Sequence, residues 1–281
     1  MSVVVQPFRE SDLEAVDGVL RSAFKNTYDR KDNLKRYLTI QSCCSFVAKI
    51  ENEVVGFGAA MDYGPFAYIG KMGVDPSTQR RGIGGGILTM ILRWLQGRKC
   101  PTFLLDASQY GGPLYEKFDF LETDLTAVMQ QNIVNRTGER MILNRAKVVE
   151  FSKLLSFDMP RFGADRLQLL RSYFEDDSSR FLVSHDGKGQ VDGFLVAQPR
   201  VIGPWVSKSV EVAEALLEEA LQFSFLEKPT VFVSASNESA VELLSRHGFE
   251  KLRTQRHMAR GKKIQRDRKG SIYGQANFSF G

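Results

Sequence analysis

The stretch that decides the fold of this chain is Val74-Asp75-Pro76-Ser77-Thr78-Gln79-Arg80-Arg81-Gly82-Ile83-Gly84-Gly85-Gly86-Ile87. An extended segment precedes it at 68–74, and apolar residues with helical spacing follow it at 87–95. Glycine lacks a Cβ, so this backbone can approach a ligand closely. The first N–H groups of a helix have no partner inside the helix, and with the helix dipole they attract anions. Because Arg80 and Arg81 add positive charge, the stretch predicts a phosphate-binding loop between a strand and a helix.

Two widespread phosphate-binding loops fit this stretch poorly. A P-loop ends in Gly-Lys-Ser/Thr, and no lysine follows these glycines. A dinucleotide-binding loop, Gly-x-Gly-x-x-Gly, directly follows a strand and is itself followed about 20 residues on by an acidic residue. Gly82 and Gly84 fit that pattern, but Ile87 stands at the third glycine position and seven residues separate Val74 from Gly82. Asp106 can serve as the acidic residue, so the dinucleotide interpretation stays open.

Two segments of the chain resemble one known family. Gln79-x-x-Gly82-x-Gly84 is similar to Gln/Arg-x-x-Gly-x-Gly/Ala, the pyrophosphate loop of the GNAT superfamily of acyl-CoA-dependent N-acetyltransferases. Further on, the segment 114–120 (Leu-Tyr-Glu-Lys-Phe-Asp-Phe) resembles the family's Leu-Tyr-Glu-Lys-x-Gly-Phe, a helix that flanks the thiol end of CoA. Asp119 stands where the family usually has glycine, and aspartate tolerates a left-handed helix end with more strain than glycine.

Length and composition describe an ordinary globular chain of one large or two average domains. The chain has 281 residues, of which 43% are hydrophobic and 25% charged. We expect no signal peptide, and the most apolar stretch, 83–95, contains Arg93 and is too short to span a bilayer. Three cysteines without metal-ligand spacing predict a reducing compartment. We therefore expect a cytoplasmic protein without a membrane partner.

Neither a metal nor a nucleic acid is expected as a partner. The three histidines are scattered, so no metal site is predicted. His247 is expected to lie at a helix end, and His257 in a late strand without a catalytic role. The net charge is +5, and basic residues gather at 260–269. No nucleic-acid recognition motif accompanies them, which favours a solvated loop.

The second half of the chain repeats the plan of the first. The matching segments are the hairpins 46–57 and 181–194, the helices 87–95 and 210–221, the strands 102–105 and 230–233, and the helix ends 118–120 and 247–249. We therefore expect an α/β (α+β) fold of two tandem modules, at 1–135 and 145–281. Each is predicted to be a mixed, mostly antiparallel twisted sheet flanked by helices.

Only the first module keeps the ligand-binding pattern. No Gln-x-x-Gly-x-Gly lies between Gly203 and the helix that Ser209 is expected to cap, and Leu244 stands where the first module has Tyr115. One cofactor site per chain is therefore predicted. This plan resembles tandem-domain GNAT proteins with a degenerate second domain, whose entry Asp-x-x-x-Phe-Gly-x-x-Arg is similar to the segment from Asp158 to Arg166. The resemblance covers nearly the whole chain.

The resemblance implies an acetyl-CoA-dependent N-acetyltransferase that moves the acetyl group to a small-molecule amine by direct attack on the thioester. It places the pantetheine arm of acetyl-CoA on the backbone of Met72, Gly73 and Val74. It assigns the pyrophosphate to the loop residues Gln79, Arg80, Arg81, Gly82, Ile83, Gly84 and Gly85. Tyr115 is implied as the group that protonates the leaving thiolate, and a phenol, whose ordinary pKa is about 10, suits that role.

The general base stays unassigned. The family often has a glutamate on the strand before the loop, but 65–71 contains no carboxylate. Tyr68, Asp62, Asp106 and Asp158 are candidates, and each has a structural role as its alternative.

The second module is expected to wall the substrate cleft, because ligand pockets favour domain interfaces. Asp158, Arg161 and Arg166 are expected either to reach into this cleft or to form an inter-domain salt bridge. Two other functions stay open: a catalytically silent acyl-CoA sensor and a dinucleotide-dependent oxidoreductase. The chain is expected to be a monomer or a homodimer.

Overall fold

The computed structural model describes residues 2–132 and 149–281. The predicted boundary between the modules, at 135–145, lies outside these residues. The first half contains β1 (Val3–Pro7), α1 (Leu13–Phe24), α2 (Lys31–Thr39), β2 (Cys43–Ile50), β3 (Glu53–Asp62), β4 (Ala67–Val74), α3 (Ile83–Gly97), β5 (Thr102–Ala107), α4 (Gly112–Glu116) and β6 (Leu121–Gln131). The second half contains α5 (Phe151–Phe162), α6 (Leu167–Asp176), β7 (Phe181–His185), β8 (Val191–Ala197), β9 (Ile202–Ser207), α7 (Val210–Ala220), β10 (Thr230–Ser234), α8 (Glu238–Arg246), β11 (Phe249–Gly261) and β12 (Ile272–Gly274). The expected mixed α/β architecture is confirmed.

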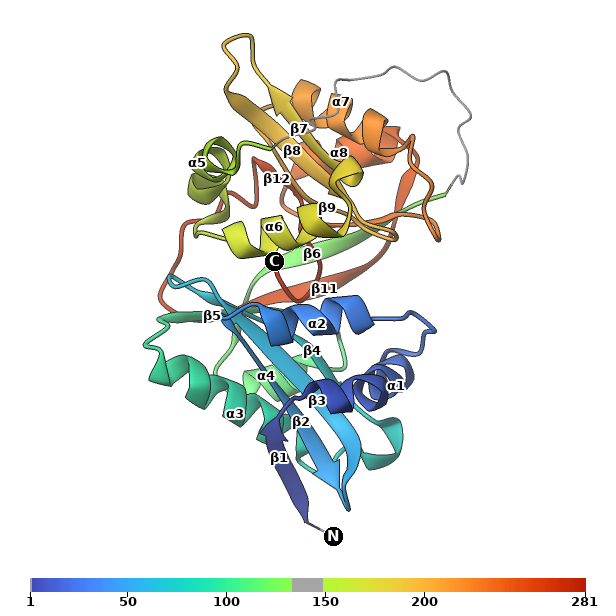
Figure 1. The fold of residues 1–281 in the computed structure, drawn as a ribbon, viewed down its shortest axis with the longest axis vertical. Helices are drawn as coiled ribbons and strands as arrows, with labels where there is room; N and C mark the ends of the chain where they lie inside the picture. The colour runs from blue at the N-terminus through green and yellow to red at the C-terminus, as the bar shows by residue number, and fades with distance from the viewer. Residues whose placement is uncertain (1, 133–148) are drawn as a thin grey trace.

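The two halves exchange strands. One sheet of eight strands has the order β1-β2-β3-β4-β5-β11-β6-β10, and a second sheet has the order β12-β9-β8-β7. β11 of the second half therefore lies between β5 and β6 of the first, and β6 in turn lies between β11 and β10 (Figure 1). All of these contacts are antiparallel, and the β6–β11 ladder runs from Phe249–Gln131 to Ala259–Leu121. Each half was expected to form a sheet from its own strands, and this exchange of strands was not predicted.

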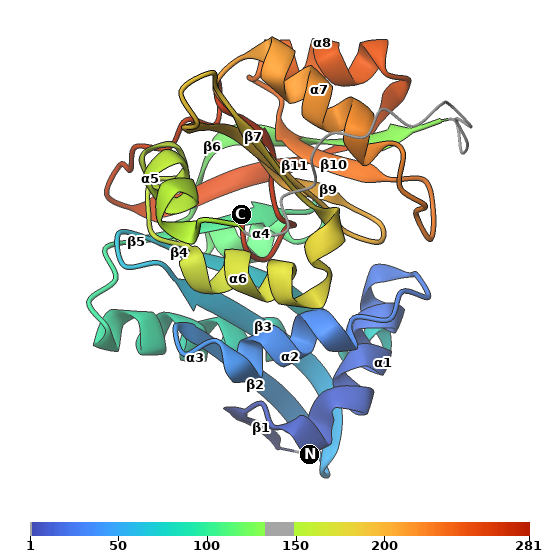
Figure 2. The ribbon, with the colours of Figure 1, turned by 45° about the horizontal axis from the view of Figure 1, so that its top comes forward.

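Helices cover both faces of the first half's sheet (Figure 2). One apolar core lies under α1 and α2 and includes Val16, Leu20 and Phe57. The opposite core lies under α3, whose Ile87 and Ile91 are fully buried. Both helices follow the pattern of an amphipathic helix, with one apolar stripe turned to the sheet. Among the described residues, no helix is long and apolar enough to cross a membrane.

β4 and β5 run parallel but separate almost at once. They pair only at Ala67–Phe103 and Tyr68–Leu104. β4 also has an irregularity in its pairing with β3, between Gly70 and Gly73, and Lys71 there is left-handed with φ 55°. A β-bulge of this kind bends a strand and is common beside active sites. Beyond Tyr68, the β5-facing edge of β4 is therefore open.

In the second half the corresponding gap is filled. β9 and β10 begin side by side through a parallel bridge at Val201–Thr230, as β4 and β5 do. β12 then pairs with β9 at Ile272–Val206, and the N–H of Gln275, just after β12, donates to the carbonyl of Phe232 in β10 at 2.8 Å. In the second half, β12 thus occupies the gap between β9 and β10, whereas the corresponding gap between β4 and β5 in the first half stays open.

Candidate active site

The glycine-rich loop presents its basic side chains and the start of α3 to solvent. Gln79, Arg80 and Arg81 are exposed, and the Gln79 side-chain amide donates to the carbonyl of Val74 at 3.0 Å, which ties the loop to the end of β4. Arg80 and Gly82 are left-handed, with φ 62° and 80°. Gly82 is the N-cap of α3, so the first N–H groups of the helix follow it directly. These groups and the arginines can bind an anion.

The glycines of this loop lie where α3 begins against α4. A Cβ on Gly84 would lie 3.3 Å from Leu114 Cδ2, and one on Gly85 would lie 3.9 Å from the Phe118 ring. The loop and the segment 114–120, which the sequence linked only by resemblance, are therefore neighbours in space. Asp119 has φ 62°, so it takes the left-handed position at which the family usually has glycine. The cofactor roles assigned to Gln79–Gly85 stay predictions.

The open edge of β4 lies beside this loop. Gly73 and Val74 pair with Phe57 and Gly56 of β3 on one side, and no strand of the described chain pairs with them on the other. Their free backbone groups can form hydrogen bonds with an extended ligand, in the way that a peptide adds a strand to a sheet edge. Met72 packs its side chain on the α3 face. The predicted role of Met72, Gly73 and Val74 uses the main chain and agrees with this packing.

Tyr115 of α4 lies on the same face of the sheet as α3. It is 8% exposed and its ring packs edge-on against Phe120, with 6.0 Å between the centroids. Burial raises its pKa well above the usual value of about 10. Within the described residues no hydrogen bond of its hydroxyl is seen. At neutral pH the phenol is therefore protonated and free to donate.

Two of the candidate bases are held in ion pairs. Asp62 accepts from Arg98 Nε at 2.7 Å and from the N–H of Gly64 at 2.8 Å, so it fixes a turn. Asp158 accepts from Arg166 Nε and Nη2, both at 2.7 Å, and both side chains are buried. This pair joins α5 to the start of α6 inside the second half. The interpretation as an inter-domain salt bridge is therefore wrong, and Asp158 and Arg166 do not reach into a cleft.

Tyr68, Asp106 and His257 form a buried polar cluster that spans both halves. The Tyr68 hydroxyl donates to Asp106 Oδ2, and His257 Nδ1 lies 3.1 Å from Asp106 Oδ1. Thr126 Oγ1 also donates to Asp106, at 2.6 Å. Burial raises the pKa of Asp106, but His257, Arg268 and the Thr126 hydrogen bond outweigh it and hold that pKa well below its usual value. Three donors satisfy this carboxylate, so it holds β4, β5, β6 and β11 together.

The sequence did not predict a role for His257, because its partners come from strands far apart in the chain. It belongs to β11, the exchanged strand, and stands opposite Asp106. Burial lowers its pKa, and the charge of Arg268 acts in the same direction, although Asp106 opposes both. Spacing alone cannot indicate that a strand from the second half lies beside β5.

The last residues of the second half cover β4 on the face that carries Tyr68. A Cβ on Gly70 would lie 2.4 Å from the Cα of Ser279, so only glycine permits this approach. The Phe280 ring packs on Tyr37 of α2, with 5.0 Å between the centroids. The Gln275 amide lies 3.3 Å from the Tyr68 hydroxyl. The segment 275–281 thus forms a wall between the halves.

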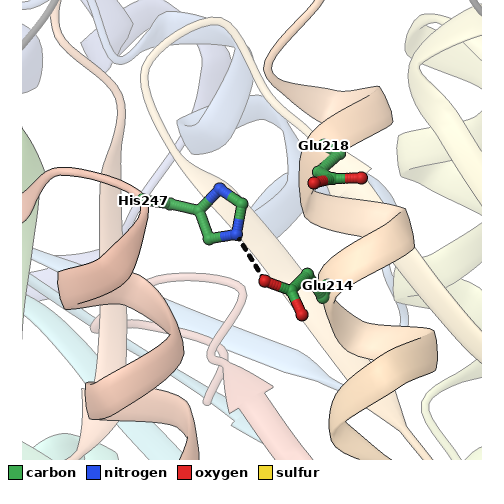
Figure 3. Close-up of side chains that lie close together, drawn as sticks. All are labelled: Glu214, Glu218 and His247. Carbon is green, nitrogen blue, oxygen red and sulfur yellow. Dashed lines mark hydrogen bonds and ion pairs between the residues drawn. The ribbon is translucent and has the colours of Figure 1, made fainter.

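One group of possible metal ligands lies apart from this region. Figure 3 shows Glu214 and Glu218 of α7 with His247, which follows α8, and their ligand atoms lie within 4.8 Å of one another. His247 Nε2 lies 2.9 Å from Glu214, and Arg246 lies 3.6 Å from the same carboxylate oxygen. These contacts already account for the group as a link between α7 and the end of α8.

Comparison with known proteins agrees with two domains of one kind. The profile of the acetyltransferase (GNAT) family matches residues 13–120, and the profile of an acetyltransferase (GNAT) domain matches residues 154–274. No curated protein matches significantly in sequence.

Solved structures share the fold over almost the whole chain. A candidate acetyltransferase from Pyrococcus horikoshii is 26% identical, with a TM-score of 0.84 over 99% of this chain and 96% of its own. A GCN5-related N-acetyltransferase from Sphaerobacter thermophilus is 14% identical, with a TM-score of 0.67 over 92% and 95%. A tandem GNAT protein from the clavulanic acid biosynthesis pathway is 14% identical, with a TM-score of 0.60 over 92% and 98%.

The chain belongs to the GNAT superfamily of acetyltransferases and carries two GNAT domains in tandem. It is therefore an acyltransferase, as the loop at 79–84 predicted.

Proposed function

We propose that this protein transfers an acetyl group from acetyl-CoA to the amine of a small molecule, using one site in its N-terminal half. The open edge of β4 beyond Tyr68 carries this proposal. The gap between β4 and β5 leads from the loop at 79–85 past the backbone of Met72, Gly73 and Val74. A pyrophosphate held by the loop would place the pantetheine arm along that edge.

The chemistry requires few protein groups. The amine nitrogen attacks the thioester carbonyl carbon, the C–S bond breaks, and the amide forms as the nitrogen loses a proton. We assign Tyr115 as the acid that gives its phenolic proton to the departing thiolate. The proton released by the amine returns the phenol to its neutral form through solvent. Because burial keeps the Tyr115 pKa high, the phenol is charged only transiently.

The second half supports a single site per chain. β12 fills the gap between β9 and β10, and Ser209 caps α7 by accepting from the N–H of Val212 at 3.4 Å. Residues 202–209 contain no glycine-rich loop. We therefore assign the second half a structural role, in which its exchanged strand β11 and the segment 275–281 complete the first half.

Calorimetric titration of acetyl-CoA into the protein, with NADH as a control, tests this proposal. We expect one acetyl-CoA site per chain and no NADH binding, followed by thiol release when an accepted amine is added. Two sites would contradict the structural role of the second half. Absence of acetyl-CoA binding would overturn the proposal, and NADH binding alone would favour the oxidoreductase. Binding without turnover of any amine would favour the acyl-CoA sensor.

A further inference from the structure

Lys71 lies where the gap between β4 and β5 has just opened. It is three residues beyond Tyr68, the last position of β4 that pairs with β5, and directly before the edge 72–74. Its left-handed backbone belongs to the bulge of β4. The charges that act on its ammonium come from Asp17 of α1, from Arg30 and from Arg36 of α2. Lys71 therefore faces the helices α1 and α2, opposite the face that carries Tyr115.

Asp17, the carboxylate that acts on Lys71, already has partners, and so does Arg36. Asp17 pairs with Arg21 at 2.6 Å and also accepts from the backbone N–H of Arg30 at 2.9 Å. Asp176 pairs with Arg36. Lys71 itself has no ion pair or hydrogen bond among the described residues, although its side chain is half-buried.

Arg30, whose charge acts on Lys71, also lacks a carboxylate partner. Arg30 is 7% exposed, and its guanidinium donates to the carbonyl of Tyr28 at 2.8 Å and to the side-chain oxygen of Asn26. No carboxylate of the described chain lies within ion-pair distance of that guanidinium. The charge of Arg30 acts on the Lys71 ammonium, and we call these two side chains the cationic pair.

We propose that the cationic pair binds an anionic group of the acceptor, so that the natural substrates are amines that carry a carboxylate or a phosphate. This inference rests on the proposed function and narrows its substrate class. A partly buried ammonium without a partner is costly, and a bound anion reduces that cost. Burial lowers the pKa of Lys71 to about 8, and the charge of Arg30 acts in the same direction. A bound anion would raise that pKa again and keep the ammonium charged.

The same charges select against other amines. A polyamine brings two or more positive charges and would be repelled by the cationic pair. An amine without an anionic group, such as an amino-acid amide or an amino sugar, would leave Lys71 without a partner. An anionic amine is anchored by its charge while its nitrogen reaches the open gap.

The test compares anionic amines with their counterparts that lack the anionic group, in the wild-type protein and in the Lys71→Met variant. The probes are glycine against glycinamide and phosphoethanolamine against ethanolamine, with spermidine as a cation. We expect the wild-type protein to prefer an anionic probe, with the carboxylate and phosphate arms identifying which anion is bound. Lys71→Met should lower kcat/KM for that probe about tenfold to a hundredfold, as the loss of one charged hydrogen bond does.

Two variants serve as controls. Lys71→Arg retains the charge and should recover much of the loss. Lys99→Met removes an exposed lysine that is also left-handed, with φ 60°, and should leave all rates unchanged. Lys71→Met should lower kcat/KM for glycinamide and ethanolamine far less than for the anionic probes. An equal loss for both kinds of amine, or a wild-type preference for spermidine or for the probes without an anionic group, would overturn the inference.

A direct binding measurement separates this inference from the proposed function. If acetyl-CoA binds but no probe is acetylated, the catalytic proposal fails, and calorimetric titration of the same probes into the CoA complex decides the inference. Binding of an anionic probe that Lys71→Met abolishes supports the cationic pair. Binding of none of the anionic probes contradicts it.

Discussion

At the scale of single residues, the protein places two buried titratable side chains on opposite faces of one sheet. Tyr115 lies in the core under α3, and His257 lies beside Tyr68, which belongs to the core under α1 and α2. The Tyr115 hydroxyl has no hydrogen bond among the described residues and is free to react. The His257 ring is held by Asp106, so these contacts give it a structural role.

Tyr115→Phe should leave acetyl-CoA binding intact and lower kcat about a hundredfold or more, since a general acid contributes on that order. The ring keeps its packing against Phe120, and only the proton donor is lost. Steady-state kinetics and calorimetry on the same samples measure the two effects. Tyr110→Phe, at a neighbouring tyrosine that is 96% exposed, is the matched control. An unchanged kcat would remove Tyr115 from the mechanism.

His257 should make the stability of the protein depend on pH. Because its pKa in the folded protein lies below the unfolded value, the unfolded chain binds a proton more readily, and stability is lost as pH falls. Around the unfolded pKa of about 6.5, this group should make the unfolding free energy rise with pH, with a slope of at most about 1.4 kcal/mol per pH unit.

Urea unfolding at several pH values measures that slope. His257→Gln should flatten it, whereas His185→Gln, at an exposed histidine, should not. The groups that face His257 are Asp106, Tyr68, Arg266 and Arg268, and they remain in both variants. Equal slopes in wild type and His257→Gln would contradict the assignment.

At the scale of elements, the two halves treat the same gap differently. Between β4 and β5 the gap is open, and between β9 and β10 it is closed by β12. A helix start with glycines accompanies the open gap, and a serine cap accompanies the closed one. We therefore expect the loop that joins β4 to α3 to be the element that decides ligand binding.

Gly84→Asp should abolish acetyl-CoA binding, because a carboxylate at the start of α3 repels phosphates. Gly84→Ala separates charge from bulk: its Cβ would lie 3.3 Å from the end of the Leu114 side chain, and the family motif accepts alanine there, so binding should be largely retained. Gly187→Asp adds the same charge at an exposed turn of the second half, where nothing lies within 4 Å, and should bind normally. Calorimetry ranks the three variants, and normal binding by Gly84→Asp would refute the loop assignment.

At the scale of the whole molecule, strand exchange makes the halves dependent on each other. Without β11, β5 and β6 of the first half have no strand between them, and without β6, β10 of the second half loses its partner in this sheet. Residues 1–135 expressed alone should therefore lack a cooperative unfolding transition and bind no acetyl-CoA. Co-expression with residues 145–281 should restore both. A stable, acetyl-CoA-binding fragment 1–135 would show that the exchange is dispensable.

The sequence predicted what is local and missed what is distant. The hairpins at 46–57 and 181–194, the helix expected at 87–95 and the cap at Ser209 follow from patterns within a few residues, although α3 begins four residues earlier, at Ile83. The place of β11 beside β5 depends on pairing between strands about 150 residues apart, for which periodicity carries no signal. For the same reason, the contact of His257 with Asp106 and the closure of the second gap by β12 were not predicted. The general base stays unassigned, because the carboxylates proposed for it are already hydrogen-bonded.

The exchange of β6 and β11 also sets an order of events during synthesis. As the chain leaves the ribosome, β1 to β5 emerge first, followed by β6, but the strand that belongs between β5 and β6 ends only at Gly261. Until then the N-terminal half presents two unpaired strand edges, which are the kind of surface that joins to other chains. The nascent protein should thus be most exposed to misassembly in the interval between the synthesis of β6 and that of β11.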